Sequence, residues 1–282
     1  MVLSRVNAGH AILDGLRAAI NSADFTGINK DPIFSLWGYS GGGITSAAAL
    51  EVTDAYAPAV NIVGAALGGL APDIPSVIQT CNHGPYAGII AGGIIGLTNE
   101  YPELAKLVDQ HLKPEAKDKF NKIKSQCLVA TAADFLFQDV LAMFDDADAL
   151  LSMPYVVNLL KENNLGHGVP KVPTFVYKGV LDDLTPVKDT DKLVQGYCDA
   201  GATSLQYYRD ATANHGSMAV VGAGRALGFL HSVMNGEKQV SGCKTKNVVS
   251  SLADFKGTKY IPGYLIDLLL DILGKPVGPI FG

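Results

Sequence analysis

Short apolar runs bounded by turn-forming residues alternate along this chain with segments whose apolar residues recur at helical spacing. Runs of the first kind are typical of buried strands, and segments of the second kind are typical of amphipathic helices. The predicted strands are Ile33–Trp37, Val60–Leu67, Val172–Tyr177 and Ser204–Tyr208. The predicted helices are Asn7–Ile20, Gly42–Val52 and Met218–Met234. Because strands alternate with helices, we expect an α/β fold with a mostly parallel sheet flanked by helices on both faces.

A long segment between the second and third predicted strands follows a different pattern. Ile74–Leu165 is predicted to be almost wholly helical, and it contains the apolar run YAGIIAGGIIGL at Tyr86–Leu97. We expect this segment to be an insertion that lies on top of the sheet rather than extending it. The 282 residues are enough for one large domain or two small ones.

Composition narrows the class of protein and the partners it can have. Hydrophobic residues make up 48% of the chain and charged residues 17%, which is typical of a globular protein with a large core. The net charge of −5 provides no basic surface, so nucleic acid is not an expected partner. No stretch reaches the roughly 18–20 apolar residues that span a bilayer, because Tyr86–Leu97 and Tyr264–Leu273 are too short. The first residues also lack the apolar segment of a signal peptide.

The stretch WGYSGGG joins the first predicted strand to the helix that follows it. A strand, Gly-x-Ser-x-Gly and a helix in this order form the nucleophile elbow of α/β-hydrolases. The serine of an elbow occupies a strained backbone conformation in a very tight turn, so the residues two before and two after it must be small. Gly38 and Gly42 meet that demand, and Gly41 and Gly43 relax the turn further. We therefore predict Ser40 as a nucleophile and the backbone N–H of Gly41 as an oxyanion donor at the helix N-terminus.

A serine hydroxyl becomes a good nucleophile only when a base removes its proton and a carboxylate orients that base. In this fold the acid and then the histidine follow the serine along the chain, each after a strand. KGVLDDLTPV, with Asp182 and Asp183, follows the third strand, and RDATANHGSM, with His215, follows the fourth. We predict His215 as the base and Asp182 as the acid, because Gly179 and Pro186 frame Asp182 in a Gly-x-x-Asp-x-x-x-Pro arrangement. Asp183 is expected to be solvated or to cap a helix.

Several stretches together make the chain resemble the fungal secretory lipases of the lipase A type, which are α/β-hydrolases. AGHAILDGLRAA resembles the helix before the nucleophile strand of that family, and WGYSGGG resembles its elbow. NHGPYAG resembles the start of its helical cap, LDDLTPV its acid loop and NHG its histidine turn. LGKPVGPI, at Leu273–Ile280, resembles its C-terminal tail.

The resemblance implies a secreted triacylglycerol lipase or related carboxylic ester hydrolase that acts through an acyl-enzyme. It implies that Ser40, Asp182 and His215 form the triad, that no metal or organic cofactor is required, and that the substrate is a lipid ester met at an oil–water interface. It also implies one α/β-hydrolase domain over residues 1–282, with a helical cap at about 74–165 that buries an acyl chain. The N-terminal strands of the family's sheet and a second oxyanion donor are expected to be missing from this chain.

The cysteines carry a further expectation. Cys81, Cys127, Cys198 and Cys243 lack the CxxC spacing of a metal or redox site, and on spacing alone two disulfides and four free thiols are both open. The resemblance implies a disulfide between Cys198 and Cys243 and therefore an oxidising, extracellular compartment. It leaves Cys127 either free or bonded to Cys81.

Two alternatives remain beside the lipase interpretation. The same triad serves short-chain esterases, acyltransferases and peptidases on this fold, and a profile across ester chain lengths would separate them. The other alternative is a catalytically weak truncated fragment that binds lipid or a partner. A fluorophosphonate probe would separate that case, because it labels only an activated serine.

Overall fold

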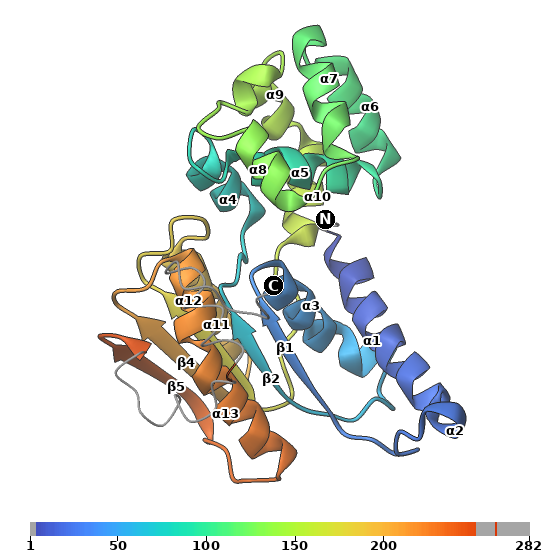
Figure 1. Ribbon diagram of the computed structural model, residues 1–282, viewed down its shortest axis with the longest axis vertical. Coiled ribbons are helices and arrows are strands. Elements are labelled where there is room, and N and C mark those ends of the chain that lie inside the picture. The colour runs from blue at the N-terminus through green and yellow to red at the C-terminus, as the bar shows by residue number, and fades with distance from the viewer. Residues whose placement is uncertain (1–3, 252–262, 264–282) are drawn as a thin grey trace, which may run out of the picture.

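Five strands form one sheet in the spatial order β1-β2-β3-β4-β5, and all neighbouring strands are parallel (Figure 1). The computed structural model describes residues 4–251 and 263. The strands are β1 (Phe34–Tyr39), β2 (Ile62–Gly68), β3 (Thr174–Gly179), β4 (Ser204–Asp210) and β5 (Gly242–Val248). Parallel neighbours require a crossover connection, and helices supply it here. The predicted α/β fold with a mostly parallel sheet is therefore confirmed.

Helices cover both faces of the sheet (Figure 1). One face carries α1 (Arg5–Asn21), α3 (Gly41–Tyr56) and α11 (Val187–Asp199), and the other carries α12 (His215–Val221) and α13 (Ala223–Met234), while the short α2 (Ala23–Thr26) follows α1. Alternate residues of a strand point to opposite faces. Accordingly, Ala65 and Leu67 of β2 belong to the core under α3, whereas Ala66 belongs to the core under α13. The sheet is thus apolar on both sides, as expected for parallel strands.

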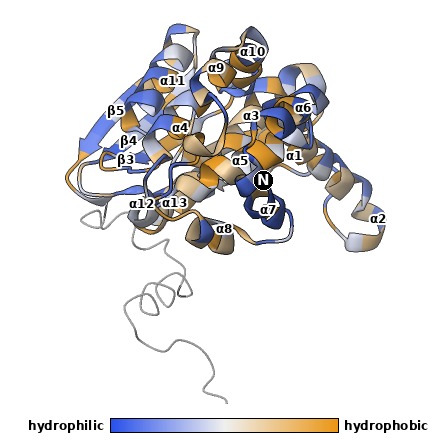
Figure 2. Cartoon of the chain, turned by 90° about the horizontal axis from the view of Figure 1, so that it is seen from above, coloured by the Kyte–Doolittle hydropathy of each residue, from blue (hydrophilic) through white to orange (hydrophobic). Residues whose placement is uncertain are grey.

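A helical layer lies between β2 and β3 in sequence and above the carboxyl ends of the strands in space (Figure 1). It comprises α4 (Ile74–Cys81), α5 (Ala87–Thr98), α6 (Pro102–His111), α7 (Pro114–Ile123), α8 (Leu128–Asp134), the 3-10 helix η1 (Leu141–Met143), α9 (Ala147–Ser152) and α10 (Pro154–Asn163). Helix α5 is strongly apolar (Figure 2). It contacts α4, α6, α7 and α8, and the cap helices share their own core. We call residues 74–163 the cap. Its bounds agree with the insertion predicted at about 74–165, and its role within a single domain stays a prediction.

A buried carboxylate attaches the segment that leaves the cap to the sheet layers. The side chain of Glu51, on α3, has no exposed surface. It accepts hydrogen bonds from the backbone N–H of Gly166 at 2.7 Å and from the hydroxyl of Tyr197 at 2.6 Å. It also forms an ion pair with Arg5 of α1 at 3.1 Å. A buried carboxylate with this many partners tolerates little movement, so it holds the segment that follows the cap against α1, α3 and α11.

The first predicted strand is more exposed than its apolar run by itself predicts. An apolar run such as Ile33–Trp37 predicts a strand covered on all sides, but β1 lies at the edge of the described sheet. As a result, 40% of Ile33 and 39% of Trp37 are exposed. The indole N–H of Trp37 donates to the hydroxyl of Tyr177 at 3.0 Å. Hydrophobic pattern alone does not reveal whether a strand has one neighbour or two, so it overestimates the burial of an edge strand.

The hydrophobic pattern also does not predict β5. Its sequence GCKTKNV is polar (Figure 2). Its central residues are exposed. β5 pairs with β4 from Ser204 opposite Gly242 to Asp210 opposite Val248. Cys243 of β5 is bonded to Cys198 of α11, so the predicted disulfide is present. Backbone pairing and the disulfide therefore hold this edge strand in place. Neither of them requires apolar residues, so the hydrophobic pattern of the sequence does not reveal the strand.

The helix predicted at Met218–Met234 is two helices, α12 and α13, which bend by 45°. The break is at Gly222, where a β-carbon would lie 2.5 Å from the ring of Tyr177. In the described part of the chain no single helix is long and apolar enough to span a membrane, and α12 and α13 meet that criterion only if they are taken together across the bend.

The remaining cysteines, Cys81 and Cys127, are both free thiols, the first buried and the second exposed. The apolar segment Tyr264–Leu273 and the tail Leu273–Ile280 lie outside the described residues.

Candidate active site

Ser40 stands at the tip of the turn between β1 and α3, where the sequence places it. Its φ of 52° and ψ of −120° are rare for a residue other than glycine. Its N–H donates to the carbonyl of Gly68 at 2.9 Å, and its carbonyl accepts from the N–H of Ile44 at 2.9 Å. The turn is thus fixed to β2 on one side and to the first turn of α3 on the other. Gly41 is the first residue of α3, where backbone N–H groups lack partners within the helix.

The glycines of the turn do not share the steric role equally. A β-carbon on Gly38 would lie 2.0 Å from the carbonyl oxygen of Gly42, and one on Gly43 would lie 2.7 Å from that of Gly68. At Gly42, by contrast, a β-carbon would meet open space. The prediction that Gly42 must lack a side chain is therefore wrong. The backbone of Gly42 crowds Gly38, and Gly43 faces the neighbouring strand.

Asp182 lies in the loop after β3, and its carboxylate is buried. Its Oδ1 accepts the backbone N–H groups of Leu184 at 3.0 Å and Thr185 at 2.7 Å. Two such bonds from the same loop fix the plane of the carboxylate. The neighbouring Asp183 is exposed, in agreement with the prediction that it is solvated.

His215 is the first residue of α12 and is held from three sides. Asn214 and Ser217 form a reciprocal capping box, in which each side chain accepts the backbone N–H of the other at 2.9 Å. The fully buried Asp210 accepts backbone N–H groups from the turn that leads into this helix. The hydroxyl of Tyr39 donates to the backbone carbonyl of His215 at 2.5 Å. The imidazole therefore begins from a fixed backbone.

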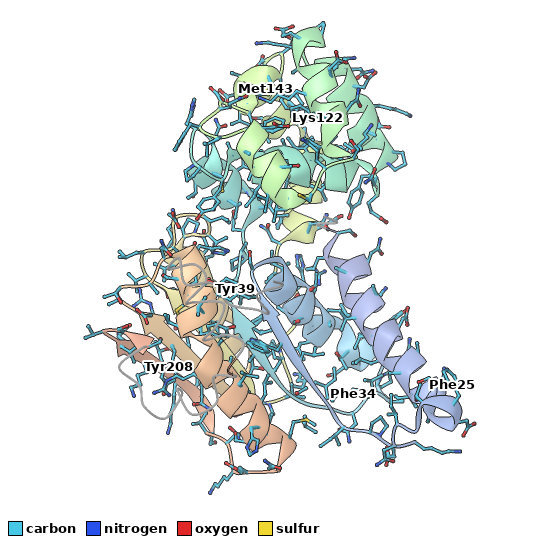
Figure 3. The ribbon with its side chains drawn as sticks, viewed as in Figure 1. Phe25, Phe34, Tyr39, Lys122, Met143 and Tyr208 are labelled. Carbon is cyan, nitrogen blue, oxygen red and sulfur yellow. A yellow bond between two sulfur atoms is a disulfide. The ribbon has the colours of Figure 1, made fainter. Side chains whose placement is uncertain are left out.

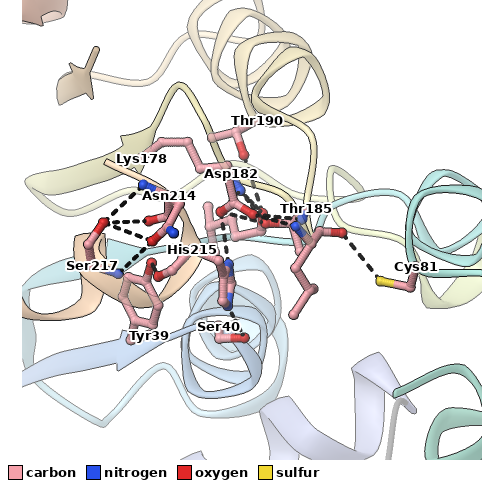
Figure 4. A network of polar contacts seen from close by, with 12 residues as sticks. Tyr39, Ser40, Cys81, Lys178, Asp182, Thr185, Thr190, Asn214, His215 and Ser217 are labelled. Carbon is pink, nitrogen blue, oxygen red and sulfur yellow. Dashed lines mark hydrogen bonds and ion pairs between the residues drawn. The ribbon is translucent and has the colours of Figure 1, made fainter. Parts of the chain in front are cut away.

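The three predicted side chains meet in one hydrogen-bonded line (Figure 4). Nε2 of His215 lies 3.0 Å from Oγ of Ser40, and Nδ1 of His215 lies 2.8 Å from Oδ2 of Asp182. This places the base within reach of the serine proton and the carboxylate within reach of the base, which is the geometry that a catalytic triad requires. The structure brings all three residues together, and their catalytic roles stay a prediction.

The charge of Asp182 is set by opposing effects. Burial by itself raises the pKa of this carboxyl, but the hydrogen bond from His215 and the positive charge of Lys178 together hold it well below its usual range. Burial raises the pKa of Tyr39 and raises that of Cys81 to about 12, so both groups keep their protons at neutral pH. Asp182 is therefore the ionised partner of His215 across the physiological range.

A cavity of about 150 Å³ opens beside Ser40 and extends among the cap helices. Ser40 and Gly41 line it at one end, and Leu184 of the acid loop lines it beside them. Among the described residues of the lining, Ser40 alone carries a polar side chain. The cap contributes, among others, Ile90 and Leu97 of α5, Val108 of α6, Leu128 of α8, Ala147 of α9 and Leu159 of α10.

A profile of the family described as secretory lipase matches residues 3–242, which is most of the chain. The chain belongs to the secretory lipase family. The resemblance predicted from its motifs is therefore confirmed.

Relatives within and around this family differ in name and length. The chain is 39% identical to Lipase A of Arthroderma benhamiae over 274 residues, which cover 96% of the chain and 58% of that lipase. It is 34% identical to "Probable trichothecene esterase SAT6" of Stachybotrys chartarum, over 81% of the chain and 47% of that protein. The solved structure of Candida antarctica lipase A matches with a TM-score of 0.85 and 24% identity, over 99% of this chain and 67% of that one. This likeness confirms the α/β-hydrolase fold, and the chain spans about half to two thirds of these relatives.

In this secretory lipase family member, three contributors to the site are not singled out by the sequence motifs described above. Tyr39 and Asp210 hold the backbone near His215, and no local pattern distinguishes them from ordinary strand residues. The capping box could be found from the spacing Asn-x-x-Ser. Within the described residues, no group of three or more His, Cys, Asp and Glu side chains is placed to hold a metal ion.

Proposed function

We propose that this protein is a carboxylic ester hydrolase of the triacylglycerol lipase type that works through an acyl-enzyme at Ser40. The observation that carries the proposal is the hydrogen-bonded line from Asp182 through His215 to Ser40, whose Ser40 end lines an apolar cavity. Membership of the secretory lipase family supports it. Because the relatives include proteins named lipase and esterase, the family alone leaves the acyl group open, and the cavity is the basis for choosing a lipid.

The reaction follows from the positions of the three side chains. Nε2 of His215 takes the hydroxyl proton of Ser40 while Oγ attacks the ester carbonyl, and the resulting oxyanion lies at the N-terminus of α3, where Gly41 donates its N–H. Asp182 holds the tautomer of the imidazole and stabilises its charged form. His215 then gives the proton to the leaving alcohol. Water, activated by the same nitrogen, releases the fatty acid from Ser40.

The cavity indicates an acyl group that is apolar along its whole length. A carboxylic ester placed at Ser40 would direct its chain among Ile90, Leu97 and Leu159, where no described lining group other than Ser40 competes for a hydrogen bond. Each buried methylene contributes about 0.8 kcal/mol, so longer chains gain affinity until the cavity is filled. A polar acyl group, such as one that carries a peptide or a sugar, would lose its hydrogen bonds with water there.

Narrowing the cavity tests both the activity and the acyl site. Ala147→Phe places a ring on a residue of α9 that lines the cavity. We expect kcat/KM for p-nitrophenyl esters to fall by about fourfold for each methylene that the ring excludes, while short esters are unaffected. Ala149→Phe, on the exposed side of the same helix, is the matched control. Equal profiles for both variants would place the acyl chain elsewhere, and a wild-type protein without esterase activity would contradict the proposed function.

An exposed apolar surface on the cap indicates how the protein meets an aggregated substrate. We call Leu128, Val129, Leu136 and Phe137 the α8 surface; they are 56%, 78%, 48% and 65% exposed. Leu128 also lines the cavity, so the α8 surface is continuous with the proposed acyl site. The backbone of Phe137 has a φ of 57°, which is unfavourable for an aromatic residue, and its ring is exposed. We infer that the α8 surface rests on an oil–water interface.

Phe137→Ser should separate activity on an interface from activity in solution. We expect the rate on an emulsified triacylglycerol to fall by roughly 10- to 150-fold, because an inserted phenylalanine contributes about 1.5–3 kcal/mol. The rate on a dissolved short ester should not change. The control is Phe25→Ser, at the end of α2 far from the cap, where the ring is 83% exposed (Figure 3). If both variants lost emulsion activity equally, the α8 surface would have no special role.

The family and a disulfide support an extracellular location. The family is described as secretory, and the Cys198–Cys243 disulfide suits an oxidising compartment. A disulfide that survives in the protein purified from culture medium would agree with this proposal, and retention of the whole protein inside the cell would contradict it.

A further inference from the structure

A lysine side chain is completely buried beside the proposed catalytic acid. Lys178 is the fifth residue of β3, a strand that is buried along its whole length, and its side chain has no exposed surface. Its Nζ lies 2.8 Å from Oδ2 of Asp182 and 3.0 Å from the carbonyl oxygen of Leu70, and it also donates to Oγ1 of Thr185 (Figure 4). A buried lysine is rare, and one that touches a reacting group requires an explanation.

The contacts of Lys178 favour its protonated form. A lysine ammonium group has three N–H donors, and Nζ has three oxygen neighbours. The hydroxyl of Thr185 donates to Oδ2 of Asp182, with 3.0 Å between the two oxygens, and the oxygen of Thr185 accepts from Nζ. Burial lowers the pKa of Lys178, and the carboxylate of Asp182 opposes that change. With three acceptors at hand, one of them ionised, the ammonium form satisfies every neighbour.

Lys178 and His215 share one oxygen atom. Nδ1 of His215 and Nζ of Lys178 are both 2.8 Å from Oδ2 of Asp182. An ammonium ion at this position draws on the same negative charge that stabilises the imidazolium form of His215. The ammonium ion therefore has two effects. It fixes the position of Oδ2, and it partly cancels the electrostatic effect of the Asp182 carboxylate on His215.

We propose that Lys178 is a positioning residue of the triad, which locks the carboxylate of Asp182 and sets the lower pH limit at which His215 works as a base. This inference rests on the proposed function. Lys178 does not contact the cavity or the serine, so its effect reaches the reaction through Asp182 alone.

Few other charges act on His215. Apart from His215, the titratable groups around Asp182 are Lys178, Asp183, Tyr39, Tyr177, Cys81 and Tyr86. Asp189 and Asp191 of α11 also act on Lys178. Burial raises the pKa of the three tyrosines and of the thiol, so these groups are neutral in the working range. The charged groups around Asp182 and Lys178 are therefore the carboxylates Asp183, Asp189 and Asp191, and Lys178 is the one positive group among those named here.

Lys178→Met removes the charge and keeps an unbranched side chain of similar length. Without the cation, the full charge of Asp182 acts on His215 and favours its protonated form. The acid limb of the pH profile of kcat/KM should therefore move upward by about one pH unit. The plateau value of kcat should fall about tenfold because Oδ2 loses a partner, and KM should stay nearly constant.

Thr190→Val is the matched control. Thr190 is also fully buried and donates to the same Leu70 carbonyl at 3.3 Å, but it is not among the hydrogen-bond partners of Asp182. We expect this variant to lose some thermal stability while its acid limb stays at the wild-type position. The substrate for all profiles is dissolved p-nitrophenyl butyrate, so the α8 surface has no part in the result.

The outcomes separate this inference from the proposed function. If wild type hydrolyses the ester and Ser40→Ala does not, the proposed function stands whatever Lys178 does. An upward shift in Lys178→Met alone supports the inference. An acid limb that stays in place or moves down, even with reduced kcat, would reduce Lys178 to a structural residue and overturn it. Lys178→Gln, which keeps two donors without the charge, is measured in the same way if the methionine variant does not fold. Failure of both variants to fold would count against the inference as well.

Discussion

Ser40→Ala is expected to lower the turnover of a chromogenic acyl ester by about four to six orders of magnitude. The hydroxyl is the only nucleophile in reach of Nε2 of His215 among the described hydrogen-bond partners, and alanine leaves that nitrogen without a proton to accept. The loss should appear in kcat, because the cavity that holds the acyl chain is unchanged. Far-UV circular dichroism should be unchanged too, since the turn depends on Gly38 and Gly43 rather than on the hydroxyl.

Ser46→Ala is the control for this substitution. Ser46 lies two turns further along α3, it is buried, and it does not line the cavity. It should keep the wild-type rate. A fluorophosphonate probe gives an independent measurement, because it should label wild type at Ser40 and should not label Ser40→Ala. Wild-type turnover in Ser40→Ala, or labelling at another serine, would show that the nucleophile is not Ser40.

Asp182→Asn is expected to reduce kcat by about 10⁴-fold and to destabilise the fold as well. The amide nitrogen of asparagine would face Nδ1 of His215 and the ammonium ion of Lys178, which are both donors. His215 then no longer has a carboxylate to hold its Nδ1–H, and the other tautomer cannot accept the serine proton at Nε2. The variant should still hydrolyse the ester faster than the uncatalysed reaction in water, because the oxyanion site and substrate binding remain.

The stability effect of Asp182→Asn comes from Lys178. Removing one partner of a buried ion pair leaves an uncompensated charge, which costs about 3–5 kcal/mol. Thermal unfolding should show a clear decrease in Tm for Asp182→Asn. The double variant Asp182→Asn with Lys178→Met should recover most of that decrease without recovering activity. If the single and double variants had the same Tm, the pair would not be coupled as its 2.8 Å distance implies.

The predicted features that agree with the structure depend mainly on neighbours in sequence. The turn at Ser40 follows from its glycines, and the strands follow from short apolar runs next to it. The meeting of Ser40, Asp182 and His215 could also be predicted, although Ser40 and His215 are 175 positions apart. Parallel strands end at one edge of the sheet, so residues that follow three of them gather there. The Cys198–Cys243 bond, in contrast, was predicted from the family resemblance alone.

The sequence by itself determined the α/β class, the glycine-rich turn at Ser40 and the helical insertion, because a period of two or 3.6 residues and a glycine-rich turn are local properties of the chain. Only the tertiary structure decided that the polar β5 joins the sheet, that cap helices enclose an apolar cavity beside Ser40, and that Lys178 is buried against Asp182. A lysine at the end of a strand has the same pattern whether it reaches water or a carboxylate. Which of the two it meets depends on how distant segments pack, and no local periodicity contains that information.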